Sequence, residues 1–277
     1  MSKEKKSLDI LGVQPIADAI KTSLEGVGTF LGKICLPAAE EYGLLLKDRV
    51  SYWRAKNLAK IARKAEKIIG EQGGLNKRRA PPRLVHMIME TGSWSDTDDI
   101  QEMWAGLLVS SCTKEGRDDE NLIFADLLSR LTVSEARMLN YVCSKSKKKL
   151  SSNKLIYAQE LLIEPDLLME ITGVENVFRL DRELDHLRSL DLFGGGFSIP
   201  KHDDPDFRQQ QEETKRKREE LIAEGRTEHL ETFKEVYTPV PDDTGLLLAR
   251  VTPNPLALSL YVRVHGSQDP IEFFGFD

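Results

Sequence analysis

Cysteine is scarce in this 277-residue sequence, and long hydrophobic runs are missing. Cys35, Cys112 and Cys143 are odd in number and lack the C-x-x-C spacing of zinc and redox motifs. This pattern favours reduced thiols over a disulfide framework or a zinc site. No apolar run approaches the roughly 20 residues that a membrane-spanning helix needs. The polar N-terminal stretch also lacks the apolar region of a secretory signal, so we expect a cytoplasmic protein.

Signatures of catalysis are also missing. The five histidines form no H-E-x-x-H motif and no Cys/His cluster. Ser110-Ser111-Cys112 has no G-x-S-x-G context, and Gly194-Gly195-Gly196 lacks the Lys and Ser/Thr of a phosphate loop, so we expect a turn there. His202-Asp203-Asp204 is more typical of an acidic loop than of a cation site. We therefore predict no enzyme activity, cofactor, metal or small-molecule substrate.

The composition is that of a well-solvated globular protein. Apolar residues make up 40% of the chain and charged residues 30%. This length allows one large domain or two modest ones, each with its own core. The net charge of −6 disfavours a general nucleic-acid binder.

The clearest pattern lies between Ser95 and Val142, where three helix-start signals precede three apolar stripes. Ser95 and Asp98 have the spacing of a capping box, and Asn121 is placed to cap a second helix. Thr132 and Glu135 form another capping box, which opens a third helix. The apolar face of the first helix follows helical spacing: Ile100, Met103, Trp104, Leu107 and Leu108.

The preceding helix, predicted from Pro37 to about Gly70, has a basic polar side. Twelve cations and three anions lie between Lys47 and Arg83, whereas Glu90–Glu135 holds eleven anions and three cations. Three interpretations stay open: contact between the two segments or plain solvated faces, binding of RNA or DNA near Tyr52 and Trp53, and binding of anionic lipid. The candidate anionic-partner surface consists of Lys47, Arg49, Arg54, Lys56, Lys60, Arg63, Lys64, Lys67, Lys77, Arg78, Arg79 and Arg83.

The stretch from Pro15 to Ile34 predicts an amphipathic helix. Two of its glycines have the spacing that lets a second backbone approach closely. Because each glycine weakens an isolated helix by about 1 kcal/mol, this helix should need a partner surface. Packing on the next helix and an interfacial position at the inner membrane both stay open. The residues of this candidate membrane or partner helix are Ile16, Ile20, Leu24, Val27, Gly28, Leu31 and Gly32.

The C-terminal half has the element order of a winged helix. After the helix from Val133 we expect a loop to Asn153, a helix at Leu155–Leu162 that ends at Glu164-Pro165, and a third helix from about Val174. A glycine turn should lead to wing strands at Phe197–Ile199 and Leu246–Val251, with a charged helical insertion at 206–238 and a last helix at Leu256–Val264. The candidate reading helix carries three cations and four anions, which favours protein interaction over DNA readout.

Two runs carry a family resemblance. E-M-W-A-G-L-L-V-S-S at Glu102–Ser111, followed by F-A-D-L-L-S-R-L-T-V-S-E-A-R-M-L at Phe124–Leu139, resembles the abortive-infection alpha (Abi-alpha) family of bacteria. That family shows an M-x-A-x-L-L-A-S-S helix, a His-Pro-x-Phe helix and then L-S-x-x-E-A. Asn121-Leu122 stands in place of the usual His-Pro, and Asn254-Pro255 stands near a late glycine of the family, so no role of that histidine transfers. The resemblance implies phage defence, in which the infected cell stops growing or dies, and it supplies no catalytic residues.

The expected fold is mainly α, with a long-helix arm at 1–92 and a helical domain at 93–277. That domain contains winged-helix-like elements at 132–265 and a small β-hairpin. We expect an anti-phage protein that acts by binding or membrane association rather than catalysis. The alternative is a nucleic-acid-binding or protein-interaction winged-helix regulator. A protein partner or self-association is expected, while anionic lipid and nucleic acid stay open as partners.

Overall fold

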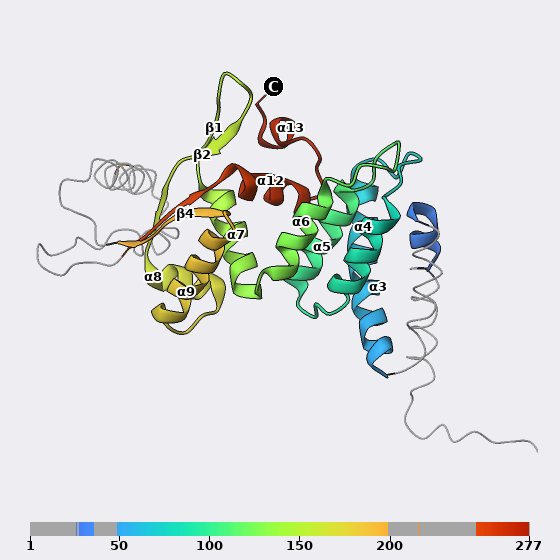
Figure 1. Ribbon diagram of the computed structural model, residues 1–277, viewed down its shortest axis with the longest axis horizontal. Helices are drawn as coiled ribbons and strands as arrows, with labels where there is room; N and C mark the ends of the chain where they lie inside the picture. The colour runs from blue at the N-terminus through green and yellow to red at the C-terminus, as the bar shows by residue number, and fades with distance from the viewer. Residues whose placement is uncertain (1–25, 27, 36–48, 199–215, 217–247, 277) are drawn as a thin grey trace, which may run out of the picture. The chain divides into compact units, whose positions relative to one another are not determined.

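The computed structural model describes residues 26, 28–35, 49–198, 216 and 248–276 (Figure 1). The chain is mainly α-helical with small antiparallel sheets, as the sequence predicted. It divides into two compact units. The first comprises residues 1–130 and 262–269, and the second comprises residues 131–261 and 270–277.

The first unit is built around one helix that is buried on almost every side. Ten of the thirteen residues of α5 are buried, as expected for a helix that is apolar around its whole circumference. The helices α3 and α6 and the π-helical turn η2 pack against it (Figure 1). The elements of this unit are α3 (Arg49–Glu71), α4 (Pro82–Met87), η2 (Ile88–Gly92), α5 (Asp98–Ser110) and α6 (Asn121–Arg130).

The predicted capping box at Ser95 is wrong. The N-cap of α5 is Thr97, whose backbone is extended at φ −90° and ψ 142°. Ser95 instead belongs to the turn that follows η2, where its amide donates to the Gly92 carbonyl over 3.0 Å. Asp98 and Asp99 nevertheless lie in the first turn of α5, where their charge complements the helix dipole.

Asn121 does not cap α6, contrary to the prediction. Its side chain is buried, and its Nδ2 donates to the hydroxyls of Ser110 and Ser111 over 3.1 and 2.9 Å. A buried amide gains more from partners inside the core than from a solvent-exposed cap. Asn121 therefore joins the start of α6 to the end of α5.

Residues 262–269 return to close the first unit beside α5. A Cβ added to Gly106 would lie 1.8 Å from the Val264 carbonyl oxygen, so only glycine permits this contact. Gln268 Nε2 donates to the carbonyls of Ser110 and Cys112 over 2.8 and 3.2 Å. Gln268 thus supplies donors to two carbonyls at the end of α5.

The second unit opens with the predicted capping box. The amide of Glu135 donates to Thr132 Oγ1 over 3.2 Å, and the amide of Thr132 donates to Glu135 Oε2 over 2.8 Å. The elements of this unit are α7 (Val133–Lys145), β1 (Lys148–Leu150), β2 (Ile156–Ala158), β3 (Leu161–Ile163), α8 (Pro165–Thr172), α9 (Val177–Ser189), β4 (Phe193–Ser198), β5 (Leu248–Pro253), α12 (Pro255–Val264, which runs into the first unit) and α13 (Pro270–Phe274).

The predicted helix at Leu155–Leu162 is wrong, because this stretch forms strands. β2 pairs antiparallel with β1, and β3 follows directly. Ile156 and Ala158 are buried while Tyr157 between them is exposed, and this two-residue period fits a strand rather than a helix. Pro165, expected as a break, is instead the first residue of α8.

A three-stranded antiparallel sheet has the order β3-β5-β4. The predicted turn at Gly194-Gly195-Gly196 is wrong, because all three glycines lie within β4. Gly195 pairs with Val251 at φ +94°, and a Cβ there would lie 1.9 Å from the Arg250 carbonyl oxygen. Glycine is therefore required by close approach of the strands rather than by a turn. The predicted charged insertion at 206–238 lies outside the described residues, apart from residue 216.

Candidate anionic-partner surface

A cationic ridge runs along α3. Lys56, Lys60, Arg63 and Lys67 follow at steps of four, three and four residues, which places them on one side of the helix. The opposite side is core, with Leu58, Ile61 and Ala65 almost fully buried. Lys67 pairs weakly with Glu71 at 3.9 Å, and the other three make no ion pair with another described residue. We call these four residues the α3 ridge.

Two other cations of α3 are neutralised by the acidic segment that follows. Lys64 Nζ lies 2.7 Å from Glu102 Oε1 and 3.4 Å from Asp98 Oδ1. Burial lowers the pKa of Lys64, but the hydrogen bonds and charges of Glu102 and Asp98 outweigh it and hold the pKa above its usual value. Arg54 pairs with Glu90 at 2.9 Å. The opposite charges of the two segments therefore meet at these residues.

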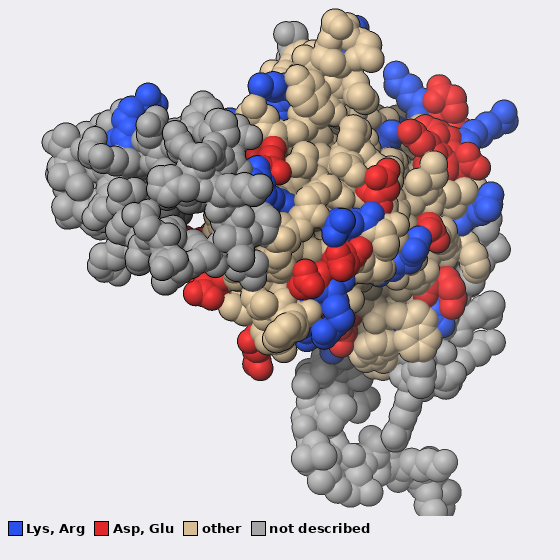
Figure 2. All heavy atoms as spheres, turned by 60° about the vertical axis from the view of Figure 1, so that its left-hand side comes forward, with Lys and Arg blue, Asp and Glu red and all other residues tan. Residues whose placement is uncertain are grey.

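Charges of opposite sign are interspersed on the face shown in Figure 2, where most blue groups have a red neighbour. This arrangement limits the surface that an anionic partner can use, because a neutralised cation contributes little. The α3 ridge differs from this arrangement, because its four cations follow one another along one side of the helix.

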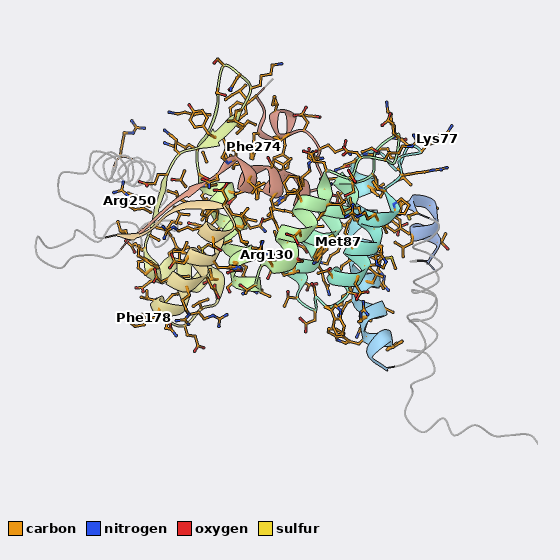
Figure 3. The ribbon with its side chains drawn as sticks, in the orientation of Figure 1. Lys77, Met87, Arg130, Phe178, Arg250 and Phe274 are labelled. Carbon is orange, nitrogen blue, oxygen red and sulfur yellow. The ribbon has the colours of Figure 1, made fainter. Side chains whose placement is uncertain are left out.

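The four predicted cations after α3 belong to a turn and to the start of α4. Arg78 donates to the carbonyls of Leu75 and Gly74, so its guanidinium is used inside the turn. The Arg79 backbone exchanges hydrogen bonds of 2.8 and 2.9 Å with Thr113. Lys77 and Arg83 are exposed, and Figure 3 shows Lys77 at the edge of the first unit. Lys47 and the side chain of Arg49 lie outside the described residues.

Exposed aromatic rings lie at the N-terminal end of α3. Tyr52, Trp53 and Trp94 are 38%, 37% and 53% exposed. The ring centroids of Trp53 and Trp94 lie 6.0 Å apart, and the Arg54 guanidinium lies 4.7 Å from the centre of the Trp94 ring. Tyr52 precedes Lys56 by one helical turn, so Tyr52 continues the α3 ridge. Sequence reasoning missed Trp94, because only the fold brings it to Trp53.

The candidate N-terminal helix is described only in part. Ile16, Ile20, Leu24 and Val27 lie outside the described residues. Leu31 is 1% exposed and packs in the first unit together with Phe30 and Ile34. A Cβ on Gly28 would meet no described residue within 4 Å, so no described backbone approaches closely at this glycine. Gly32 is half-buried. Among the described residues no helix has the length and apolar character to span a bilayer.

In α9, the candidate reading helix, two arginines form ion pairs with acidic residues of the same helix. Arg179 pairs with Glu183 at 3.0 Å, and Arg188 pairs with Asp185 at 2.7 Å. In contrast, Phe178 is 77% exposed and points outward in Figure 3. An exposed aromatic side chain among paired charges is typical of a protein-binding surface rather than a phosphate-binding one.

A second cationic surface escaped sequence reasoning. Residues 136–159 contain six cations and no anion, and they include the β1–β2 hairpin. The absence of acidic residues from this segment could have indicated a cationic surface. The incorrect prediction of a helix at Leu155–Leu162 prevented us from recognising the hairpin that carries these cations. In the described part of the chain no group of three or more His, Cys, Asp or Glu side chains is placed to hold a metal ion.

Comparison with protein families shows the family to which this chain belongs. Residues 54–239 match the model of the family Abortive infection alpha. The chain belongs to this family. The matched span of this Abi-alpha protein begins at Arg54 in α3 and continues past β4, so it includes the α3 ridge and the β1–β2 hairpin. No curated protein and no solved structure matches the chain.

Proposed function

We propose that this Abi-alpha protein acts in abortive infection by binding a phosphate-bearing partner, either an anionic lipid surface or a nucleic acid, rather than by catalysis. Family membership supports the role in phage defence. The observation that carries the mode of action is the α3 ridge, in which three cations in sequence on one helix side have no acidic partner among the described residues.

The chemistry of the ridge and its aromatic end suits phosphate. An anionic lipid surface attracts each cation near it with about 1 kcal/mol, and Trp and Tyr favour the interface between headgroups and water. Single-stranded nucleic acid uses the same two features, because bases stack on exposed aromatic rings while lysines contact the backbone. A peripheral position at the inner membrane follows from the lipid case, and a cytoplasmic position from the nucleic-acid case.

The test compares binding of the full chain to vesicles of phosphatidylcholine, with and without phosphatidylglycerol, and to a labelled single-stranded RNA. The variant Lys56→Glu/Lys60→Glu/Arg63→Glu should lose binding to whichever anionic partner the wild type prefers. Lys114→Glu/Arg117→Glu/Arg130→Glu is the matched control, because these cations also lie in the first unit but outside the ridge. Binding that is insensitive to salt, or that both variants lose equally, would contradict the proposal.

A protein partner is the second candidate, and Phe178 favours it. We infer that the elements from α7 to β5 form a winged helix, supported by the order β3-β5-β4 and by the position of α9 before β4. Its α9 would then bind protein rather than DNA. Cross-linking in infected cells should recover a partner with the wild type and not with Phe178→Ser, while Ile123→Ser serves as the control at another exposed apolar position.

A further inference from the structure

The β1–β2 hairpin has an outer face that combines apolar and cationic side chains. Leu155, which immediately precedes β2, and Tyr157 are 51% and 43% exposed, and the buried Ile156 lies between them in the alternating pattern of an extended chain. Lys149 is the partner of Tyr157 across the strands, which places it on the same side as Tyr157. Leu150, at the end of β1, is the partner of the buried Ile156 and therefore lies on the opposite side, although it is 36% exposed.

The inner face holds the hairpin in place. Ile156 and Ala158 are only 6% and 7% exposed. Lys148 turns back into the unit, where its Nζ donates to the carbonyls of Cys143 and Ser144 and lies 5.3 Å from the centre of the Phe274 ring. Burial lowers the pKa of Lys148. Because a two-stranded hairpin is only marginally stable by itself, these inner-face contacts stabilise it within the second unit.

The chain segment that contains the hairpin carries charge of one sign. Between Glu135 and Glu160 the chain contains Arg137, Lys145, Lys147, Lys148, Lys149 and Lys154, and no acid. Lys145, Lys149 and Lys154 are exposed, and Lys154 lies in the loop at the tip of the hairpin. In Figure 1 this loop projects away from α7 and α9 of the same unit.

We infer that the outer face of the β1–β2 hairpin docks on an anionic lipid bilayer. Leu155 and Tyr157 enter the boundary between headgroups and acyl chains, and Lys149 and Lys154 contact lipid phosphates. An apolar face bordered by lysines is the combination that interfacial binding requires. The inference concerns the second unit and does not depend on the α3 ridge of the first.

Other occupants fit this face less well. Leu155 gains nothing from stacking on bases, and all exposed cations of the hairpin are lysines, which lack the planar fork that arginine offers to a phosphate backbone. A second copy of the chain would bring the same positive charge to the contact, and like charges facing each other are unfavourable. A bilayer with anionic headgroups satisfies both the apolar and the cationic groups.

Vesicle flotation of the full chain tests the inference directly. Vesicles of phosphatidylcholine with phosphatidylglycerol should float the protein, and vesicles of phosphatidylcholine alone should not. Lys149→Gln/Lys154→Gln should reduce the partition coefficient about fivefold for each lysine removed. Leu155→Ser/Tyr157→Ser should reduce it about tenfold or more. Ile123→Ser, which also removes an exposed apolar side chain, should leave it unchanged.

A probe on the hairpin separates this contact from binding elsewhere. The native thiols Cys35, Cys112 and Cys143 are all buried, so Leu155→Cys provides one accessible thiol for an environment-sensitive fluorophore. Its emission should shift to the blue with anionic vesicles, including in the triple α3-ridge variant. A protein that floats while this emission stays unchanged binds lipid by another surface, which overturns the hairpin inference and leaves the α3 proposal standing. Absence of flotation, or preference for single-stranded RNA over vesicles, also overturns it.

Discussion

The imidazole Nδ1 of His186 lies 2.7 Å from Oε1 of Glu135, whose side chain is only 2% exposed. An ionised carboxylate only accepts hydrogen bonds, so the ring nitrogen is the donor. The other carboxylate oxygen of Glu135 accepts the amide of Thr132. One buried side chain thus caps α7 and attaches it to α9 within the second unit.

Removal of the imidazole should destabilise this contact. We expect His186→Ala to lower the free energy of unfolding by about 1–3 kcal/mol, because it leaves a buried carboxylate oxygen without its donor. Urea denaturation followed by circular dichroism measures the change. Arg188→Ala is the control on the same helix, because its pair with Asp185 is exposed and should be worth about 0.5 kcal/mol or less. Equal effects of the two variants would show that the buried pair adds no stability.

Gly106→Ala should destabilise the first unit by about 1–3 kcal/mol, since a methyl group would force the Val264 carbonyl away from α5. Gly70→Ala provides the opposite case. In the described part of the chain nothing lies within 4 Å of a Cβ at this position of α3, and alanine should stabilise the helix by about 0.5–1 kcal/mol. Thermal melting of the two single variants should therefore shift in opposite directions, and a tolerated Gly106→Ala would contradict the close approach.

Asn121→Leu should cost about 1–3 kcal/mol, because it removes the amide that donates to the hydroxyls of Ser110 and Ser111. Asn121→His should recover part of this loss, because an imidazole N–H can donate to one of the two hydroxyls. Chemical denaturation of both variants gives the comparison. If Asn121→Leu were as stable as the wild type, the hydrogen bonds from Asn121 to Ser110 and Ser111 would contribute nothing to stability.

Alkaline pH should weaken the fold through the thiol of Cys112. Burial raises the pKa of this thiol from 9.0 to about 11, with a smaller opposing effect of Arg78. The resulting contribution to folding is complete below pH 9, the range of the unfolded thiol, and is lost as the pH rises through about 11. Cys112→Ser should reduce the decline in stability between these two values. At neutral pH the native protein should react slowly with a thiol reagent and react with all three cysteines once it is unfolded.

Local signals predicted part of this fold correctly. The capping box of Thr132 and Glu135 could be identified because its spacing and chemistry are complete within four residues. The stripe of Ile100, Met103, Trp104, Leu107 and Leu108 is buried as predicted. Asn121 shows the limit, because its cap-forming chemistry was outweighed by two hydroxyls that only the packing of α5 and α6 brings near.

Partners distant in the sequence could not be predicted. Gly195 looked like a turn residue because the carbonyl that requires a glycine belongs to Arg250. The same holds for the candidate surface. Its twelve cations were visible in the sequence, but the acids that neutralise Arg54 and Lys64 depend on how α3 packs on η2 and α5. The hairpin lysines were visible too, whereas the exposure of Leu155 and Tyr157 depends on the strand that replaced the predicted helix.

The order in which the chain is made gives the late strand β5 a further significance. β5 is the central strand of its sheet, and β3 and β4 have no pairing within that sheet until residues 248–253 are present. The first unit is also incomplete until residues 262–269 have been synthesised, because this segment packs beside α5. A ribosome therefore exposes more than 240 residues before either unit can be completed. A nascent or prematurely terminated chain that lacks residues 248–269 would have neither unit complete, so synthesis of this late segment is itself a condition for the protein to reach its working form.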